Sequence, residues 1–235
     1  MKVLLASLKH FVVQKLQVSN QQAITYILAG RVRVNGSNGQ LQQALQPEDE
    51  VTFEGQVIKE PKAFVYLAYN KPRGIESTLN THVENNLTHA LNLNQRVFPI
   101  GRLDKESEGL MLLTNDGTVL YKTIHAKIHQ EKEYLVSVDR PLTPEALQHL
   151  ATGIMIMGKQ TRPAVVAQIN THAFRIILNQ GLNRQIRRMC YKLGYQVQQL
   201  IRTRIVNLEL GGLEPGEWRY LSQPEVQELL QAVAT

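Results

Sequence analysis

The chain contains only one cysteine, Cys190, among its 235 residues. A single cysteine excludes an internal disulfide framework and any zinc site built from several cysteines. Because Cys190 lies in a stretch typical of a helix, residues 187–193, we interpret it as a small buried hydrophobic residue and not as a nucleophile. The seven histidines show no metal-binding spacing, and the chain has no P-loop or dinucleotide-binding glycine motif. The sequence therefore predicts a protein without a metal ion.

Long apolar runs are also missing. No stretch approaches the 18 apolar residues of a membrane span, and residues 1–6 are too short and too weakly organised for a secretory signal. The hydrophobic fraction of 43% nevertheless supports a folded core. We therefore expect a cytoplasmic protein that does not cross a membrane.

Acidic residues are fewer than basic ones. The chain has 26 Lys or Arg against 20 Asp or Glu, a formal net charge of +6. A basic chain favours a polyanionic partner, although many soluble proteins are mildly basic. The distribution is more informative, because residues 181–204 contain six Lys or Arg and no Asp or Glu. This basic stretch favours binding to nucleic acid.

Residues 1–60 have the pattern of a small separate module. Apolar residues at helical spacing follow Ser7, and Ser19 with Gln22 has the form of a capping box for a second helix over about 20–29. Short strands are expected around the Asn35-Gly36 turn and around Gly55. The polar segment 59–62 contains a proline and is a plausible linker.

Residues 61–235 combine strand-like runs with a few helices. Strands are expected over residues 64–69, 110–113, 134–138, 165–169 and 174–178, and helices over 144–150, 184–193 and 222–230. Met155 and Met157 are expected to fill gaps in the core. Strand-rich runs with few helices indicate a mixed α+β domain and not repeated βαβ units.

Two segments far apart in the sequence carry groups suited to catalysis. Residues 101–110, GRLDKESEGL, place Asp104 on a loop bounded by glycines before an apolar run, and residues 180–189, QGLNRQIRRM, place three arginines around a short helix. A carboxylate that stays ionised in a desolvated pocket needs a nearby cation, and a guanidinium suits it. By itself, an Asp after a Gly-Arg-Leu turn more often caps a turn.

The loop 101–110, followed by residues 113–117, resembles the catalytic loop of RNA pseudouridine synthases. Segments with the same order of motifs support the resemblance: 69–74, 131–136, 181–189 and 216–219. The likeness is to the RsuA-like branch, which acts on ribosomal RNA. Within that branch, residues 181–190, 194–197 and 202–205 are most similar to the large-subunit synthase F type.

The resemblance implies a fold in two parts. Residues 1–60 would form an αL-type RNA-binding domain, and residues 61–235 a mixed α/β catalytic domain built on a mainly antiparallel sheet with a central cleft. The N-terminal part departs from the family, because residues 19–22 are SNQQ where arginines are usual, whereas Arg31 and Arg33 are retained. Six basic residues face five acidic ones over residues 1–60. We therefore expect weaker phosphate contact from this part than is usual.

The implied function is the isomerisation of one or two uridines in large-subunit (23S) ribosomal RNA to pseudouridine, and a tyrosine transfer RNA anticodon is a further possible substrate. The reaction breaks the N-glycosidic bond, turns the uracil and rejoins it through carbon 5. It has no redox step and no group donor, so it needs no cofactor. A stem-loop partner RNA and a monomeric enzyme are expected.

The resemblance implies three catalytic residues. Asp104 would be the essential carboxylate, as nucleophile, general base or stabiliser of positive charge. Arg187 would pair with it, and Tyr134 would lie against the target uracil, which must leave its stack to react. Without the family, Tyr134 would be interpreted as strand packing and Arg187 as a solvated helix residue touching phosphate.

Further residues are assigned to RNA contact. Arg184 and Arg188 fit backbone phosphates, Arg102 would help to fill the space left by the flipped base, and Leu200 would form part of an apolar wall. Lys71 and Arg73, beside Pro72, are expected where a strand ends in a loop, and they could face RNA or be merely solvated. Arg31 and Arg33, which the N-terminal part retains from the family pattern, are further candidates.

Two other functions are compatible with parts of the sequence. An RNA-binding or ribosome-assembly protein with vestigial catalytic residues would show the same basic stretch, but it has no need of a paired carboxylate. A glycoside hydrolase would also cleave a bond at a sugar carbon, but it generally needs two facing acids. Glu106 and Glu108 are near Asp104 in sequence, yet their context does not suggest a facing acid.

Overall fold

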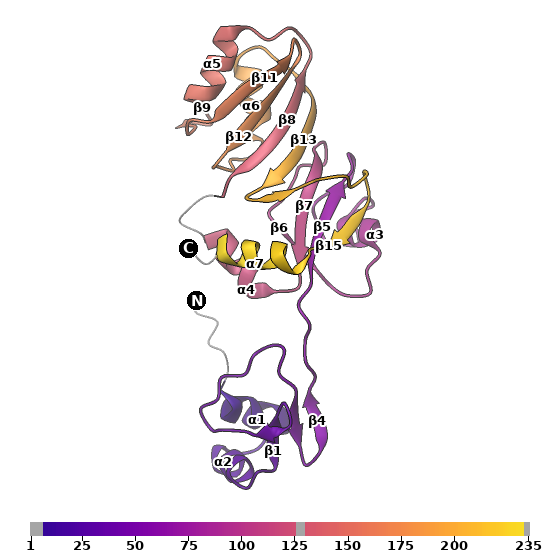
Figure 1. The fold of residues 1–235 in the computed structure, drawn as a ribbon, viewed down its shortest axis with the longest axis vertical. Helices are drawn as coiled ribbons and strands as arrows, with labels where there is room; N and C mark the ends of the chain where they lie inside the picture. Colours follow the sequence, from indigo (N-terminus) through magenta and orange to yellow (C-terminus); the bar gives the residue numbers. More distant parts are fainter. Residues whose placement is uncertain (1–6, 126–129, 233–235) are drawn as a thin grey trace. The chain divides into compact units, whose positions relative to one another are not determined.

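The computed structural model of the chain describes residues 7–125 and 130–232. It divides into two compact units, Met1–Phe64 and Val65–Thr235, which Figure 1 shows in colours that follow the sequence. The boundary lies after Phe64, four residues beyond the one expected from the polar linker, because strand β5 begins only at Tyr66.

The first unit combines two helices with a small sheet. Its helices are α1 (Leu8–Leu16) and α2 (Asn20–Leu28), and its sheet has the order β2-β1-β3-β4, with bounds Ser37–Asn38, Val32–Val34, Val51–Phe53 and Gln56–Lys59. The capping box at α2 is confirmed: the Ser19 hydroxyl accepts from the Gln22 N–H, and the Gln22 side chain accepts from the Ser19 N–H. A buried apolar cluster joins the helices to the sheet: Leu8, Val12, Ala23, Ile27, Val32, Val34, Leu45 and Val51.

The second unit is built on one large sheet. The order along its main path is β11-β12-β8-β13-β7-β5-β15, and β14 pairs with β13 while β6 pairs with β7. The strands run over β5 Tyr66–Lys71, β6 Phe98–Ile100, β7 Glu108–Thr114, β8 Lys132–Val138, β11 Val165–Asn170, β12 Ala173–Leu178, β13 Val197–Ile205, β14 Leu208–Glu209 and β15 Trp218–Tyr220. A separate two-stranded hairpin joins β9 Met155–Ile156 to β10 Lys159–Gln160.

The sheet is mainly antiparallel, and among its described strands only β13 and β7 pair in parallel. This pairing is short, and it sets Arg202 beside Gly109. A Cβ at Gly109 would lie 2.3 Å from the Arg202 carbonyl oxygen, and the glycine has a φ of +100°. Glycine is therefore required where these two strands approach most closely.

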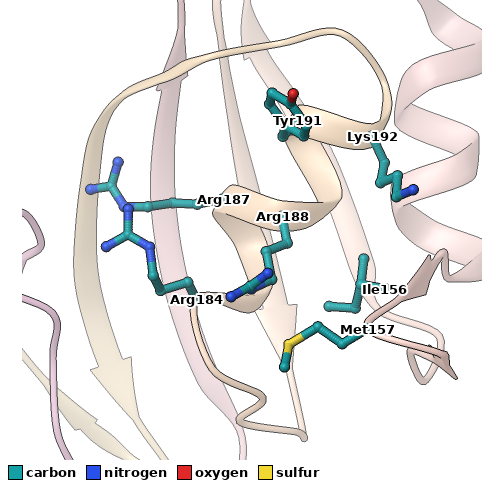
Figure 2. Close-up of a pocket in the computed structure, with 7 residues that line it drawn as sticks. All are labelled: Ile156, Met157, Arg184, Arg187, Arg188, Tyr191 and Lys192. Carbon is teal, nitrogen blue, oxygen red and sulfur yellow. The ribbon is translucent and has the colours of Figure 1, made fainter.

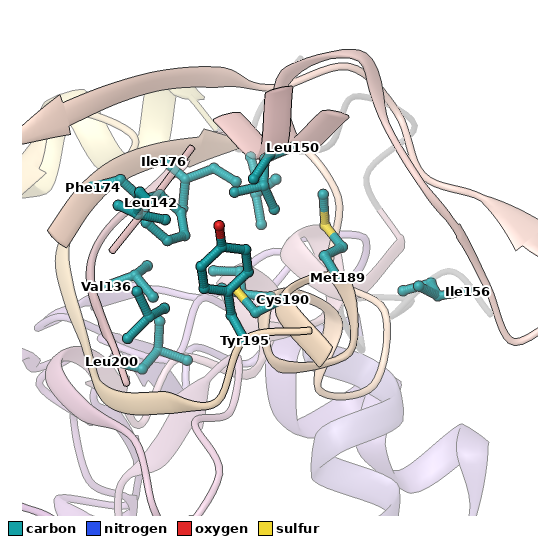
Figure 3. Packing of buried hydrophobic residues seen from close by; sticks show 14 residues of the cluster. Val136, Leu142, Leu150, Ile156, Phe174, Ile176, Met189, Cys190, Tyr195 and Leu200 are labelled. Atoms are coloured by element: carbon teal, nitrogen blue, oxygen red, sulfur yellow. The ribbon is translucent and has the colours of Figure 1, made fainter. Parts of the chain in front are cut away.

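The helices of this unit alternate irregularly with the strands along the chain. They are α3 Leu87–Leu91, α4 Gly117–His125, α5 Pro144–Thr152, α6 Gln185–Lys192 and α7 Gln223–Ala232. Side chains of α5 and α6 share one apolar cluster with strands β8, β12 and β13 (Figure 3). In it, Met189 and Cys190 of α6 and Leu150 of α5 are almost fully buried. The buried, apolar setting of Cys190 raises its pKa to about 12, which confirms a packing role for this thiol.

A second apolar cluster lies under the other half of the sheet. It joins Leu67 and Tyr69 of β5 and Met111 and Leu113 of β7 to helix α3. Tyr134 packs against this cluster and also against the first one. Tyr134 therefore lies where the two halves of the sheet meet.

Several elements differ from the expectations. Strand β13 runs for nine residues although its sequence contains polar positions, and β5 is shifted by two residues toward Lys71. Met155 and Met157 do not fill a core gap, because they are 54% and 62% exposed on the β9–β10 hairpin. Within the described residues, no helix is long and apolar enough to cross a membrane.

Candidate active site

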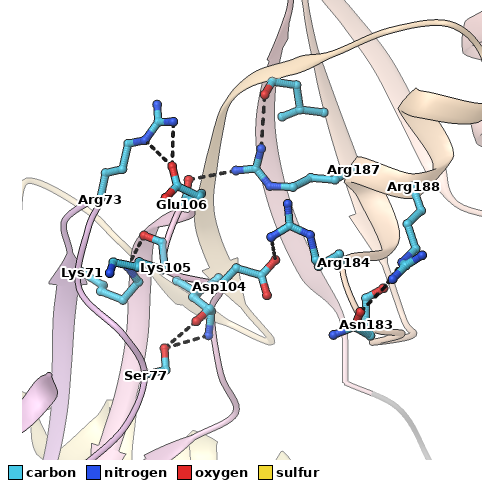
Figure 4. Close-up of polar contacts among 12 residues, drawn as sticks. Lys71, Arg73, Ser77, Asp104, Lys105, Glu106, Asn183, Arg184, Arg187 and Arg188 are labelled. Carbon is cyan, nitrogen blue, oxygen red and sulfur yellow. Dashed lines mark hydrogen bonds and ion pairs between the residues drawn. The ribbon is translucent and has the colours of Figure 1, made fainter. Parts of the chain in front are cut away.

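The loop between β6 and β7 presents Asp104 to a pocket of about 680 Å³. Leu103 is buried and belongs to the cluster under α3, so the residue before Asp104 is anchored in the core. The Ser77 hydroxyl donates to the Leu103 carbonyl oxygen at 2.6 Å and accepts from the Leu103 N–H at 3.1 Å (Figure 4). This paired contact fixes the backbone directly before Asp104.

Arg184 provides the cation that Asp104 meets. Its Nη1 lies 3.6 Å from Asp104 Oδ2, and both side chains are partly exposed (Figure 4). Arg184 is the N-cap residue of α6 and has a φ of +51°, in the left-handed region. Non-glycine residues in this region are uncommon and strained, and they cluster at functional sites.

Arg187 lies one turn further along α6, and its side chain binds the backbone of the same loop. Its Nη2 donates to the Glu106 carbonyl oxygen at 2.8 Å and its Nη1 to the Val197 carbonyl oxygen at 3.2 Å. Its buried Nε has no hydrogen-bond partner among the residues that the structure describes. Burial, with a further contribution from Arg184, lowers the pKa of Arg187, and Asp104 opposes this effect. The charge of Asp104 therefore acts on Arg187, although no ion pair joins these two side chains.

The sheet supplies the pocket wall opposite the loop. Tyr134 of β8 is directly opposite Arg202 of β13 in the antiparallel register, and Leu200 and Lys132 follow at two-residue spacing. Residues two apart on a strand share a face, and residues opposite each other across strands share it too. All four of these residues line the pocket. Its wall is therefore one patch of sheet that carries an aromatic ring, an apolar side chain and two cations.

A second pocket, of about 440 Å³, lies along the other side of α6. It is lined by Ile156, Met157, Arg184, Arg187, Arg188, Tyr191 and Lys192, whose side chains Figure 2 shows as sticks. Arg188 donates to the Asn183 carbonyl oxygen at 3.0 Å. Four of the seven side chains are cationic and none is acidic, so this pocket favours an anion.

Most of the residues that line these two pockets lie in a segment of the chain that matches a known family. A sequence model described as RNA pseudouridylate synthase matches residues 65–192, which include Asp104, Tyr134 and Arg187. The chain belongs to this family. The enzyme is therefore an RNA pseudouridine synthase, as the motifs around residues 101–117 and 181–190 indicated.

Known relatives agree with this assignment. The synthase is 43% identical over 217 residues to dual-specificity RNA pseudouridine synthase RluF of Escherichia coli strain K12, with 92% of this chain and 75% of that protein covered. It is 32% identical over 220 residues to the ribosomal large subunit pseudouridine synthase B of Bacillus subtilis, with 90% of each chain covered. A crystal structure of a pseudouridylate synthase superposes with a TM-score of 0.66 at 28% identity, over 95% of this chain and 99% of that one. The expected mixed α/β fold on a mainly antiparallel sheet is confirmed.

The structure brings five of the sequence-predicted residues of the synthase to one pocket: Asp104, Tyr134, Leu200, Arg102 and Arg184. The partner of Asp104 differs from the expected one, which was Arg187. Among the described residues, the ion pair of Asp104 is with Arg184, whereas Arg187 donates to two backbone carbonyls. Arg188 lies in the second pocket and not in the first.

Lys71 requires a correction. It was assigned to RNA contact, but it is fully buried at the end of β5. Its Nζ donates to the carbonyl oxygens of Pro72 and Ile75 at 2.8 Å and of Lys105 at 3.4 Å. A lysine so enclosed cannot reach a phosphate, and it instead ties the 72–75 turn to the loop that carries Asp104.

Arg73, Arg31 and Arg33 occupy exposed positions. Arg73 forms a two-nitrogen contact with one Glu106 oxygen, at 2.8 Å from its Nη2. Arg31 pairs with Glu54 and lies over the Tyr26 ring, 4.3 Å from its centroid. Arg33 is exposed in the middle of β1. Two of these arginines are thus already engaged within the protein.

Three residues of the Asp104 pocket were not predicted as functional from the sequence: Ser77, Lys132 and Arg202. Arg202 was counted in the basic stretch but was not distinguished from its exposed neighbours. Its position directly opposite Tyr134 follows only from the register of β8 and β13. Ser77 lies in an irregular segment, where no periodicity marks a residue that contacts Leu103.

The burial of Lys71 leads to a prediction about pH and stability. Burial lowers the pKa of Lys71 to about 8, partly opposed by Glu108, Glu106 and Asp104. Between pH 8 and 10.5 the unfolded chain then holds a proton that the folded chain lacks, so folding stability contributed by this group rises with pH. Compared with Lys71→Met, the wild-type free energy of unfolding should increase across this range, by at most about 1.4 kcal/mol per pH unit. Urea unfolding of both proteins at pH 7.5, 8.5 and 9.5 measures this, and parallel curves would contradict it.

Proposed function

We propose that this synthase converts one or two uridines of large-subunit ribosomal RNA to pseudouridine, with Asp104 as the essential carboxylate. The observation that carries the proposal is the meeting of Asp104, Arg184 and Tyr134 in one pocket of about 680 Å³. Pockets of this size hold small ligands, and a single flipped nucleotide fits this range. The name of the Bacillus subtilis relative supports the large ribosomal subunit as the source of the substrate.

Transfer RNA is a second substrate in this proposal. The Escherichia coli relative is described as having dual specificity, which supports action on more than one RNA. The tyrosine transfer RNA anticodon is the candidate that the family resemblance suggests. We propose that the enzyme acts as a monomer in the cytoplasm, where both RNAs occur.

The proposed roles follow from position. Asp104 faces the anomeric carbon of the target, and its negative charge assists glycosidic cleavage as nucleophile, as base or by stabilising positive charge. Tyr134 offers its ring to the flipped uracil, since aromatic stacking suits any extruded base. Leu200 adds an apolar contact beside it. Arg187 acts on Asp104 through the loop backbone and through its charge.

The backbone of the RNA on either side of the target nucleotide would bind along the cationic side chains. The basic pocket along α6 suits backbone phosphates, and Arg184 connects it with the Asp104 pocket because it lines both. Arg102 is exposed at the rim of the Asp104 pocket and is positioned to occupy the place of the extruded base. We propose the first unit as an RNA-binding domain that contributes modestly, since Arg33 remains exposed while Arg31 is paired with Glu54.

Mapping pseudouridines tests the substrate. Ribosomal and transfer RNA from cells with and without this gene would be compared at nucleotide resolution, and the loss of one or two large-subunit sites is expected. Re-expression of the wild-type gene should restore them, whereas re-expression of Asp104→Asn should not. If every site persists without the gene, the protein would instead be an RNA-binding or ribosome-assembly factor.

Ser77 should position Asp104. Ser77→Ala removes both hydrogen bonds to Leu103 and leaves the buried Leu103 N–H without this partner. The free energy of unfolding should fall by about 1–3 kcal/mol. We expect kcat to fall about tenfold with little change in KM, because a small displacement of a reacting group lowers turnover. Single-turnover kinetics on the mapped RNA measures this split. Ser77→Thr keeps the hydroxyl and should recover most of the rate; equal defects in both variants would indicate a general packing effect.

A further inference from the structure

Arg202 is the most deeply buried cation of the Asp104 pocket. Its side chain is 1% exposed, yet it lines the pocket. Its Nε donates to the Leu110 carbonyl oxygen at 2.7 Å. Its Nη2 has no hydrogen-bond partner, and it forms no ion pair, among the residues that the structure describes. A buried charge of this kind is costly, so an unused donor on a residue that lines a pocket indicates an acceptor supplied from outside.

Lys132 extends this cationic position. It lines the same pocket, and its Nζ donates to the Gln130 carbonyl oxygen at 3.0 Å. Burial and then the charge of Arg202 lower the pKa of Lys132, so the two cations lie close enough to interact. Neither has a carboxylate partner in the described part of the chain. Together they present only donors, because neither guanidinium nor ammonium can accept a hydrogen bond.

The depth of this position distinguishes between two acceptors of RNA. A phosphate belongs to the backbone, which passes the mouth of the pocket when a nucleotide is flipped in base first. The deepest wall therefore meets the edge of the base that is farthest from the sugar. In uracil that edge carries O4. In the proposed function, Tyr134 contacts the face of the same ring.

Uracil can keep such a contact throughout its rearrangement. To exchange N1 for C5 at the sugar, the base turns about the axis through N3 and C6, and this turn exchanges O4 with O2. Both are carbonyl oxygens, so a fixed set of donors meets an acceptor before and after the turn. Cytosine would instead bring its 4-amino group, a donor, against Arg202 and Lys132.

We propose that Arg202, assisted by Lys132, is the carbonyl-binding site of this pocket, donating to O4 of the target uracil before the turn and to O2 after it. The site accounts for the choice of uracil over cytosine, since buried donors left without an acceptor strongly disfavour the wrong base. This assignment rests on the proposed function, and it adds a specificity determinant that is separate from Asp104.

A thermodynamic cycle that combines a change in the protein with a change in the substrate tests the proposal. Single-turnover rates would be measured on the mapped hairpin with uridine or 4-thiouridine at the target, since sulfur is a weaker acceptor. For the wild type we expect 4-thiouridine to react about 10- to 100-fold more slowly, the range of one hydrogen bond from a charged donor. In Arg202→Met, which cannot donate, the penalty should shrink to the intrinsic effect of the sulfur.

The controls separate the possible failures. Arg204→Met changes an arginine of the same strand that pairs with Glu131 and Glu133, and it should keep the wild-type penalty. If Arg202→Met does not fold, Lys132→Met repeats the cycle at a half-buried position. An equal penalty in the wild type and in the folded pocket variant would overturn the proposal. A wild-type enzyme that is inactive on the uridine hairpin would contradict the proposed function instead.

Discussion

Asp104→Asn should abolish pseudouridine formation, with a loss of about 10⁴-fold or more in kcat, because removal of a group that acts directly on the reacting bond has effects of this size. The amide keeps the shape of the side chain but carries no negative charge, so cleavage of the glycosidic bond loses its anionic partner. Asp104 is partly exposed, and Leu103 and Ser77 hold the backbone beside it, so the fold should be unchanged. Tritium release or mass spectrometry on the mapped RNA measures the rate.

A neighbouring carboxylate provides the matched control. Glu106 lies on the same loop, but its side chain pairs with Arg73 at the surface. Glu106→Gln should therefore stay within a few-fold of the wild-type rate. RNA affinity of Asp104→Asn, measured by filter binding, should match that of the wild type, since no phosphate contact is lost. Substantial activity in Asp104→Asn would remove the proposed mechanism altogether.

Arg187→Met should have the second largest effect, a fall in kcat of about 10²- to 10³-fold, the loss typical when one preorganised donor is removed from a catalytic site. The substitution removes a cation in the field of Asp104 and also the donor to the Glu106 carbonyl oxygen, which fixes the loop. The free energy of unfolding should fall by about 1–3 kcal/mol, because the Glu106 and Val197 carbonyls lose their donor.

Arg184→Met separates the two arginines. Its ion pair with Asp104 is partly exposed, and such pairs contribute little in water. Because Arg184 lines both pockets, its loss should mainly weaken RNA binding and raise KM. Arg187→Lys should restore part of the rate, since it keeps the charge but loses the two-pronged contact. If Arg184→Met lowers kcat more than Arg187→Met does, the ion pair seen in the structure would be the one that matters for turnover.

Local signals in the sequence predicted many elements well. Helix α2 begins at its capping box, and α5 begins at Pro144 after Thr143, because side-chain capping involves residues only three apart. The apolar run of β7 is buried on both faces, as a continuous run in a central strand should be. These features depend on neighbours in the chain, and for that reason they can be recognised without the fold.

Other elements were not predictable in this way. Strand β13 contains glutamines and arginines, and it is a strand because β8 and β7 pair with it on both sides. Met157 appeared to be a core residue by type, yet it turns the β9–β10 hairpin with a φ of +50° and is exposed. For β13, partners distant in sequence decide the outcome, and residue type alone carries no record of them. For Met157, the local β9–β10 hairpin decides it, because the residue stands in the turn between the two strands.

The amino-acid sequence by itself determined the family and the basic segment 181–204, and it predicted Asp104 as the catalytic carboxylate, because these are ordered motifs of contiguous residues. Only the tertiary structure decided which basic residues lie beside Asp104 and which are used within the fold. About eighty residues separate Asp104 from α6, and the fold places the Arg184 side chain at Asp104, whereas Arg187 donates to the loop backbone. Likewise, burial turns Lys71 into a structural lysine and strand register places Arg202 opposite Tyr134. Such choices arise from long-range packing, which short-range sequence patterns do not encode.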